Sequence, residues 1–88
     1  MEPDASWSAP LRALWRDAHD DWEGAHAEVQ SDESPDGAWV HAYLHRKEGD
    51  PGNARYWYAR AQRPASSATL PDEWRQIVLA LLAPDANS

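Results

Sequence analysis

Two histidines and a glutamate are spaced so that a single helix would present them together. His41, His45 and Glu48 follow one another at intervals of four and three residues, which puts their side chains on one flank of a helix. Imidazole nitrogens and a carboxylate are ligands that suit Zn²⁺, Mn²⁺ or Fe²⁺. His26 or His19, from an earlier part of the chain, would complete the set. The pattern predicts a candidate metal site formed by His26, His41, His45 and Glu48.

The same histidines have an ordinary structural interpretation. Pairs of histidines four residues apart occur on many helices, and Glu48 does not adjoin the first histidine as the glutamate of the metalloprotease motif His-Glu-x-x-His does. His26 falls beside an apolar stripe, where a half-buried imidazole bonded to a carboxylate or carbonyl is expected. The sequence therefore predicts no cofactor, although it leaves a divalent metal open as an alternative. It identifies no catalytic residue.

A second group of residues could hold an anion or a planar ligand. Its members are guanidinium groups, a phenol and a residue at an expected helix start, namely Arg46, Asn53, Arg55, Tyr56 and Arg60. Guanidinium groups bind anions and stack on rings, and the first turn of a helix offers free backbone N–H groups. The competing interpretation is that aromatic side chains here pack inward while the arginines cover exposed faces or pair with acids.

The elements that position these residues are predicted to be helices. Between residues 11 and 29, apolar side chains recur at spacings of three and four residues, at Leu11, Leu14, Trp15, Ala18, Trp22, Ala25 and Val29. Asp20 resembles an N-cap with Glu23 three residues later, and Gly24 weakens a continuous helix. We therefore favour two helices with a break near Asp20 over one long helix.

Proline and glycine delimit two further helices. Ser34 and Pro35 resemble a cap and a first-turn proline, so a helix should run from Pro35 to about Glu48 and stop at the turn of residues 49–52. Asn53 is expected to cap the next helix. Its apolar stripe would consist of Ala54, Trp57, Tyr58 and Ala61.

The last helix follows a linker over residues 64–70 and carries the stripe Trp74, Ile77, Val78, Leu81 and Leu82. No segment alternates with period two for long enough to form a strand. The predicted fold class is all-α, a compact bundle of four or five short helices in a single domain over residues 1–88. Residues 1–8 and 84–88 are expected to be disordered or loosely attached tails.

Size and composition indicate how such a small bundle could be stabilised. The chain has 88 residues and six tryptophans, and a domain this short gains much from large aromatic side chains because it buries only about 60% of its unfolded surface. We expect the tryptophans to supply much of the core. The absence of cysteine excludes disulfides, thiolate metal sites and a cysteine nucleophile.

The charge distribution bears on partners and location. A net charge of −7 argues against nucleic acid as a partner, because phosphate binding needs clustered lysine and arginine. Residues 1–36 carry ten acidic and two basic side chains, whereas residues 37–70 carry two acidic and five basic ones, so we expect ion pairs between the two parts. The sequence contains neither a long apolar run nor a secretion signal. We therefore expect a cytoplasmic location and no membrane partner.

Two resemblances add to this interpretation. The stretches 14–30 and 44–60 both consist of a helix, a tight turn containing aspartate and a second helix, and they resemble degenerate tetratricopeptide-type hairpins. The strings WVHAYLHRKEGD (39–50) and GNARYWYARA (52–61) resemble a family of small uncharacterised bacterial proteins. This resemblance implies a bacterial, cytoplasmic origin and carries over no functional residue.

The sequence leaves two functional classes open. The first is a non-enzymatic interaction or small-ligand-binding module that uses the surface around His41, His45, Arg55 and Tyr56. The second is a metal-binding protein or metal-dependent enzyme centred on the histidines. A protein partner or a homodimer is also plausible, because the last helix carries enough apolar residues to cover both its own core and a partner.

Overall fold

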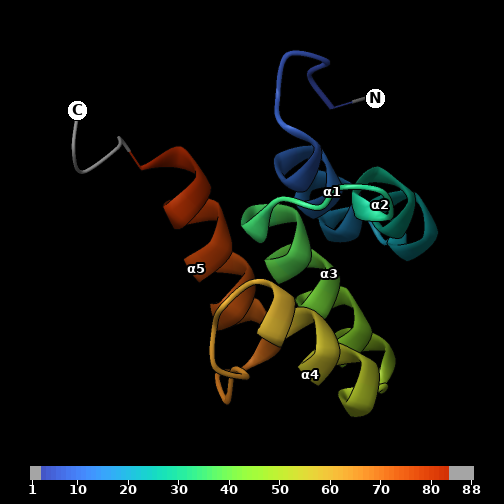
Figure 1. Cartoon of the computed structure of the whole chain (residues 1–88). Helices are drawn as coiled ribbons and strands as arrows, with labels where there is room; N and C mark the ends of the chain where they lie inside the picture. The colour runs from blue at the N-terminus through green and yellow to red at the C-terminus, as the bar shows by residue number, and fades with distance from the viewer. Residues whose placement is uncertain (1–2, 84–88) are drawn as a thin grey trace.

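The computed structural model describes residues 3–83, which form five α-helices and no strand (Figure 1). These are α1 (Ala9–Ala18), α2 (Trp22–Val29), α3 (Pro35–Glu48), α4 (Pro51–Arg60) and α5 (Leu70–Leu82). The predicted all-α bundle is confirmed. The expected break is also present, because Asp20 adopts a φ of 60° between α1 and α2.

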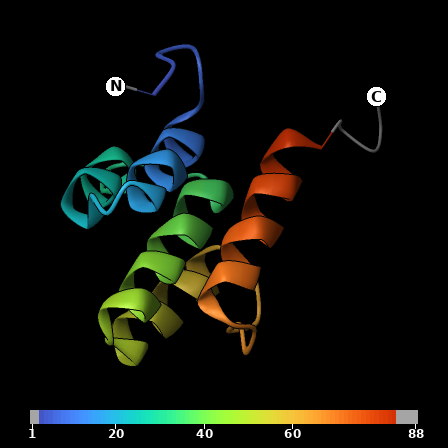
Figure 2. The same ribbon diagram turned by 180° about the vertical axis from the view of Figure 1, so that it is seen from behind.

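Helix α3 is the central element of the bundle. It lies between the α1–α2 hairpin on one side and α5 on the other, with α4 packed along it, as both views show (Figures 1 and 2). Its residues from Gly37 to His45 are all buried, so α3 has no wholly exposed face over this stretch. The two hairpins, α1 with α2 and α3 with α4, make the most extensive helix contacts.

Two of the predicted helix caps are shifted in the structure. Asp21, not Asp20, caps α2 and accepts a hydrogen bond from the backbone N–H of Gly24 at 2.9 Å. Asp50, not Asn53, caps α4, and its carboxylate accepts from the backbone N–H of Asn53 at 3.2 Å. In both cases a residue adjacent to the turn takes the cap because its side chain reaches the free N–H groups of the first turn.

The bounds of α3 agree with the sequence prediction, whereas α5 begins at Leu70, inside the predicted linker. Ser34 caps α3 through the N–H of Gly37, and Thr69 caps α5 through the N–H of Asp72. Gly49 ends α3 in the left-handed conformation, with a φ of 89°. A residue without a Cβ adopts this conformation at little cost, which explains why the helix ends there.

The tryptophans line the core more than they fill it, contrary to expectation. The fully buried apolar side chains of larger volume are aliphatic, namely Leu14, Val29, Val40, Leu44 and Ile77. Of the six tryptophans, only Trp39 is buried, and Trp7 is 36% exposed. Two indole N–H groups instead tie helices together, from Trp22 to the carbonyl of Leu44 at 2.9 Å and from Trp74 to that of Leu14 at 3.0 Å. An indole has a polar N–H that needs a hydrogen-bond partner when it is buried. This requirement favours a position of the ring at the edge of a core.

Polar side chains also connect the helices in the interior. Glu73 of α5 is fully buried and accepts hydrogen bonds from Trp39 Nε1, Tyr58 Oη and Arg46 at 3.2, 2.5 and 2.7 Å. Asp17 of α1 accepts from Tyr43 Oη and Lys47 Nζ, both at 2.8 Å. The expected pairing of the basic middle part with the acidic first part therefore occurs at Lys47, whereas Arg46 pairs with α5.

The predicted tails fall partly outside the described residues. Residues 1–2 and 84–88 are not described, and residues 4–7 form a turn closed by a bond from the N–H of Trp7 to the carbonyl of Asp4 at 3.0 Å. Within residues 3–83, no helix combines the length and hydrophobicity needed to cross a bilayer.

Candidate metal centre

Three of the predicted metal ligands converge between α2 and α3. His26 comes from the second half of α2, and His41 and His45 are one turn apart on α3. Within residues 3–83, these histidines form a group in which one potential ligand atom from each lies within 4.8 Å of the others. The packing of α2 against α3 therefore brings together residues that are separated by up to 19 positions in the sequence.

The closest pair already has a separation near that of two metal ligands. His26 Nε2 and His41 Nε2 are 3.0 Å apart. Two imidazole nitrogens bound tetrahedrally at the usual Zn–N distance would be about 3.3 Å apart. Without a metal, the same two atoms can share one proton in a hydrogen bond between neutral rings. The geometry thus allows a neutral hydrogen-bonded pair, and in a metal site the three ligand atoms, now within 4.8 Å of one another, would move closer together.

Burial favours the metal-binding form of two of the three imidazoles, His41 and His26. Burial, followed by the nearby His26 and His45, lowers the pKa of His41 from 6.5 to about 4. Burial is also the main reason that the pKa of His26 is lowered, with His45 adding to the effect and Glu48 opposing it. His41 is therefore neutral at pH 7, and neutral imidazole is the protonation state that coordinates a metal.

One atom of the cluster is not satisfied by the protein. His41 Nδ1 is buried and has no hydrogen-bond partner among the described residues. An unpaired buried polar atom costs free energy, and such atoms are uncommon in folded proteins. His41 is thus held in place by its surroundings and not by a full set of hydrogen bonds.

Aromatic rings supply those surroundings. Trp57 of α4 stacks on His41 with ring centroids 3.9 Å apart, and Trp22 stacks on His26 at 5.0 Å. His41 and His45 stack on each other at 4.8 Å. These rings fix the orientation of the imidazoles and limit the access of water, which strengthens electrostatic interactions at the site.

Glu48 lies beside the three-histidine group. Its Oε2 is 2.7 Å from His45 Nδ1. A carboxylate bonded to one imidazole nitrogen orients the ring and leaves the other nitrogen, here Nε2, free for a metal. Glu48, which the sequence placed among the candidate ligands, contacts His45 and is not among the residues whose ligand atoms converge within 4.8 Å.

The fourth histidine lies outside the cluster. His19 stacks on Trp15 with a centroid distance of 3.9 Å, and its Nδ1 lies 2.8 Å from the Trp15 carbonyl. Of the two histidines that the sequence offered to complete the site, the structure selects His26.

The structure places the predicted anion-binding residues in two different surroundings. Arg46 turns to Glu73 and to the carbonyl of Ala68. Arg60 instead lies with Tyr56, whose hydroxyl accepts from the guanidinium at 3.1 Å, and Arg55 and Asn53 are exposed on α4. Arg46 thus bonds outside this group, whereas the other four residues lie on α4.

Sequence reasoning missed Trp22 and Trp57 as walls of the site. Both were assigned to the apolar stripes of their helices, and helical spacing alone cannot show that their rings cover histidines. Trp22 lies four residues before His26, a spacing that places two rings on the same face and could have indicated this stacking.

No family model, curated protein or solved structure matches the chain. The arrangement of its own residues is therefore the basis for a functional interpretation.

Proposed function

We propose that the protein binds a divalent transition metal through His26, His41 and His45. The convergence of the three imidazoles within 4.8 Å is the observation that carries the proposal. The closest nitrogen pair, at 3.0 Å, approaches the spacing of ligands around one ion. The low pKa of His41, about 4, means that a metal does not have to displace a proton from this ring at pH 7.

The donor set favours Zn²⁺ or a similar borderline ion. Imidazole nitrogens suit Zn²⁺, Cu²⁺, Ni²⁺ and Fe²⁺, whereas Mg²⁺ and Ca²⁺ prefer sites composed of oxygen ligands. Three imidazoles leave a fourth position for water, while the Glu48 carboxylate, 2.7 Å from His45, orients that ring. An open position of this kind is also what a metal-dependent enzyme would need.

The test is metal binding by untagged protein that has been stripped with a chelator and returned to chelator-free buffer. Calorimetry with Zn²⁺ and the visible spectrum with Co²⁺ should both show one site per chain. We expect His26→Ala to weaken Zn²⁺ binding by at least tenfold, because it removes one of three ligands. Glu48→Gln should weaken binding by roughly ten- to a hundredfold, as outer carboxylate partners do at other sites.

His19→Ala is the matched control, because it removes the histidine that bonds Trp15 and not the cluster. It should bind Zn²⁺ like the wild type. Circular dichroism of each variant separates loss of a ligand from loss of the fold, and His26 is suited to this because it is only half-buried. Equal Zn²⁺ affinity of the His26→Ala and His19→Ala proteins would refute the proposal and leave the cluster as a hydrogen-bonded structural feature.

The interaction or ligand-binding module remains a second proposal. What favours it is the exposed arrangement of Tyr56, which is 53% exposed, with Arg60 beside it. Arg55→Ala or Tyr56→Ala would weaken capture of a partner without changing Zn²⁺ binding. A homodimer, a cytoplasmic location, a bacterial origin and tetratricopeptide-like hairpins likewise stay proposals.

A further inference from the structure

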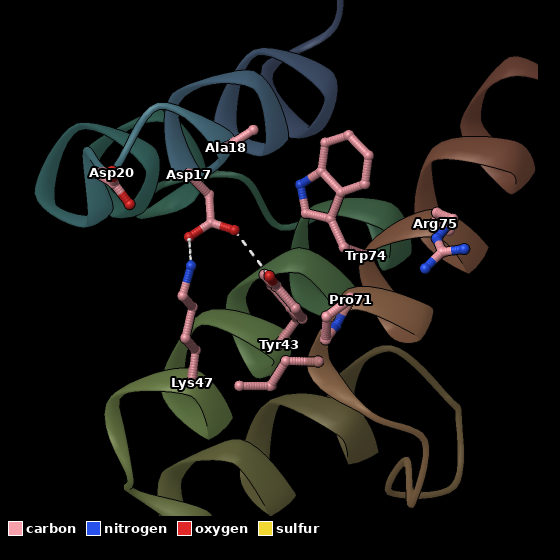
Figure 3. A pocket seen from close by; sticks show the side chains of 9 residues that line it. Asp17, Ala18, Asp20, Tyr43, Lys47, Pro71, Trp74 and Arg75 are labelled. Atoms are coloured by element: carbon pink, nitrogen blue, oxygen red, sulfur yellow. Dashed lines mark hydrogen bonds and ion pairs between the residues drawn. The ribbon is translucent and has the colours of Figure 1, made fainter.

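Three arginines on α4 and just after it lack an acidic partner. The chain has eight lysine and arginine side chains, and five of them form ion pairs with carboxylates, namely Arg12, Arg16, Arg46, Lys47 and Arg75. Figure 3 shows one such pair, in which Lys47 reaches Asp17 at 2.8 Å. Within residues 3–83 the remaining three, Arg55, Arg60 and Arg63, form no ion pair with a carboxylate. The unpaired cations of this acidic protein are therefore gathered in the single segment 55–63.

Aromatic rings hold two of these guanidinium groups in place. The guanidinium carbon of Arg63 lies 3.5 Å from the centroid of the Trp39 ring. Arg60 lies over both Tyr56 and Trp57, at 5.8 and 5.5 Å from their centroids, and donates to the Tyr56 hydroxyl at 3.1 Å. Stacking uses the face of a guanidinium, whereas its N–H donors point outward in the plane of the group. The rings thus orient these arginines and leave N–H groups available to an oxyanion.

The surface that carries these arginines is open to solvent. Arg55, Tyr56, Arg60 and Arg63 are all exposed, and Tyr56 is 53% exposed. Helix α4 packs mainly against α3 and lies on the outside of the bundle (Figures 1 and 2). We call these four side chains the α4 arginine surface.

Two acidic residues adjoin this surface without forming ion pairs with it. Asp50 precedes α4 and caps its first turn, at the end of the helix away from Arg60 and Arg63. Glu73 lines the same small hollow as Arg63, but it is fully buried and pairs with Arg46 at 2.7 Å. Among the described residues, the positive charge is therefore least compensated at the C-terminal end of α4.

We propose that the α4 arginine surface binds a short acidic segment of a partner protein. Aspartate or glutamate carboxylates would accept paired hydrogen bonds from Arg60 and Arg63, and Tyr56 would contact the apolar part of the segment. The ten residues of α4 span about 15 Å, which an extended peptide covers with about four to five residues. This inference rests on the proposed interaction module and names the chemistry of its partner, and it does not depend on the metal site.

A short segment fits this surface better than a long polyanion or a second copy of the chain. Residues 1–36 carry ten acidic and two basic side chains, so a long nucleic acid would also meet the acidic part of the molecule and be repelled there. A second copy has the same net charge of −7, which opposes its approach. A few carboxylates on a short segment need only the arginine surface.

The probe is a synthetic peptide of about six residues, alternating glutamate and glycine and blocked at both ends, which matches the reach of α4. Its comparison peptide has glutamine in place of glutamate. Nuclear magnetic resonance of the isotope-labelled protein at low salt measures both the affinity and the site. The glutamate peptide should bind at least tenfold more tightly, because only carboxylates form charge-assisted bonds with guanidinium groups. Amide shifts should concentrate in residues 55–63, and added salt should weaken binding.

Variants of the protein locate the binding site. Arg60→Gln and Arg63→Gln should each weaken binding of the glutamate peptide several-fold, and circular dichroism checks that these exposed changes leave the fold intact. Arg75→Gln is the matched control, because Arg75 is an exposed arginine of α5 that pairs with Asp72. It should bind the peptide like the wild type. Arg60→Lys keeps the charge but loses the planar fork, so its affinity should fall between those of the wild type and Arg60→Gln.

Four outcomes would overturn the proposal. Equal affinity for the glutamate and glutamine peptides would refute an acidic partner and leave the interaction module with a partner of other chemistry. Unchanged affinity of the folded Arg60→Gln and Arg63→Gln proteins would place the peptide elsewhere. Tighter binding of an oligothymidylate of equal charge, lost in the same two variants, would assign the surface to nucleic acid. Light scattering that shows a dimer, which Arg63→Gln dissociates and Arg75→Gln does not, would assign the surface to a second copy.

Discussion

At the scale of single residues, His41 is the most constrained side chain of the cluster. It is 3% exposed and stacked on Trp57, and its Nε2 lies 3.0 Å from Nε2 of His26. A positive charge on this ring would have neither water nor a carboxylate beside it, which is why its pKa falls to about 4. His45, in contrast, has a carboxylate beside it, because Glu48 bonds its Nδ1.

The low pKa of His41 predicts how the stability of the metal-free protein depends on pH. In the unfolded chain the ring has a pKa near 6.5, so below that value the unfolded state binds more protons than the folded state. The stabilisation is complete above pH 6.5 and is lost as the pH falls toward 4. The free energy of unfolding should decrease by on the order of 2 to 3 kcal/mol over this range.

Urea unfolding at several pH values in the presence of a chelator measures this dependence. His41→Gln should flatten it, because glutamine does not titrate. His19→Gln removes a histidine outside the cluster and should keep the wild-type dependence. A wild-type protein whose unfolding free energy is the same at pH 7 and pH 4.5 would contradict the assignment of a buried neutral imidazole.

At the scale of elements, two tight turns decide where the hairpins fold. Asp21 and Asp50 cap the second helix of each hairpin in the same way, by accepting from the backbone N–H three residues later. Asp50 follows Gly49, whose left-handed conformation ends α3. The turn between α3 and α4 thus stops one helix and starts the next within two residues, which keeps His41 and Trp57 on facing helices.

The shifted cap of α4 predicts a difference between two neighbouring polar residues. Asp50→Ala should lower the free energy of unfolding by about 1 kcal/mol, because one N–H of the first turn loses its acceptor. Asn53→Ala should change it by less than about 0.5 kcal/mol, since the Asn53 side chain makes no cap bond. Thermal or urea unfolding of the two proteins measures the difference, and the reverse order would restore Asn53 as the cap.

At the scale of the whole molecule, Glu73 joins three helices. Its fully buried carboxylate accepts from Trp39 and Arg46 of α3 and from Tyr58 of α4. These bonds hold α5 against the α3–α4 hairpin. Burial and the Glu73 hydrogen bond raise the pKa of Tyr58 far above its ordinary value, so the phenol remains a donor at any physiological pH.

Removing this carboxylate should destabilise the whole bundle. We expect Glu73→Ala to lower the free energy of unfolding by roughly 3 to 5 kcal/mol, because Arg46 loses its buried partner and two donors lose their acceptor. The adjacent Asp72→Ala removes an exposed carboxylate that pairs with Arg75 and should cost less than about 1 kcal/mol. Equal losses in urea unfolding would show that Glu73 does not join the helices in solution.

Some features of this protein follow from the sequence alone. The all-α class, the bounds of α3 and the break near Asp20 depend on proline, glycine and capping residues, whose effects are local. The spacing of His41, His45 and Glu48 likewise predicts that they share one flank of α3, because helical periodicity is a local property.

Tertiary packing decided the rest. Only the contact of α2 with α3 selects His26 over His19, because the sequence does not specify which face of one helix meets another. The full burial of Glu73 could not be predicted either, since an acidic residue in a first turn is ordinarily explained by the helix dipole. The apolar stripe of α5 predicted burial, yet Leu82 is 62% exposed, because helical periodicity does not show how much of a stripe the neighbouring helices cover.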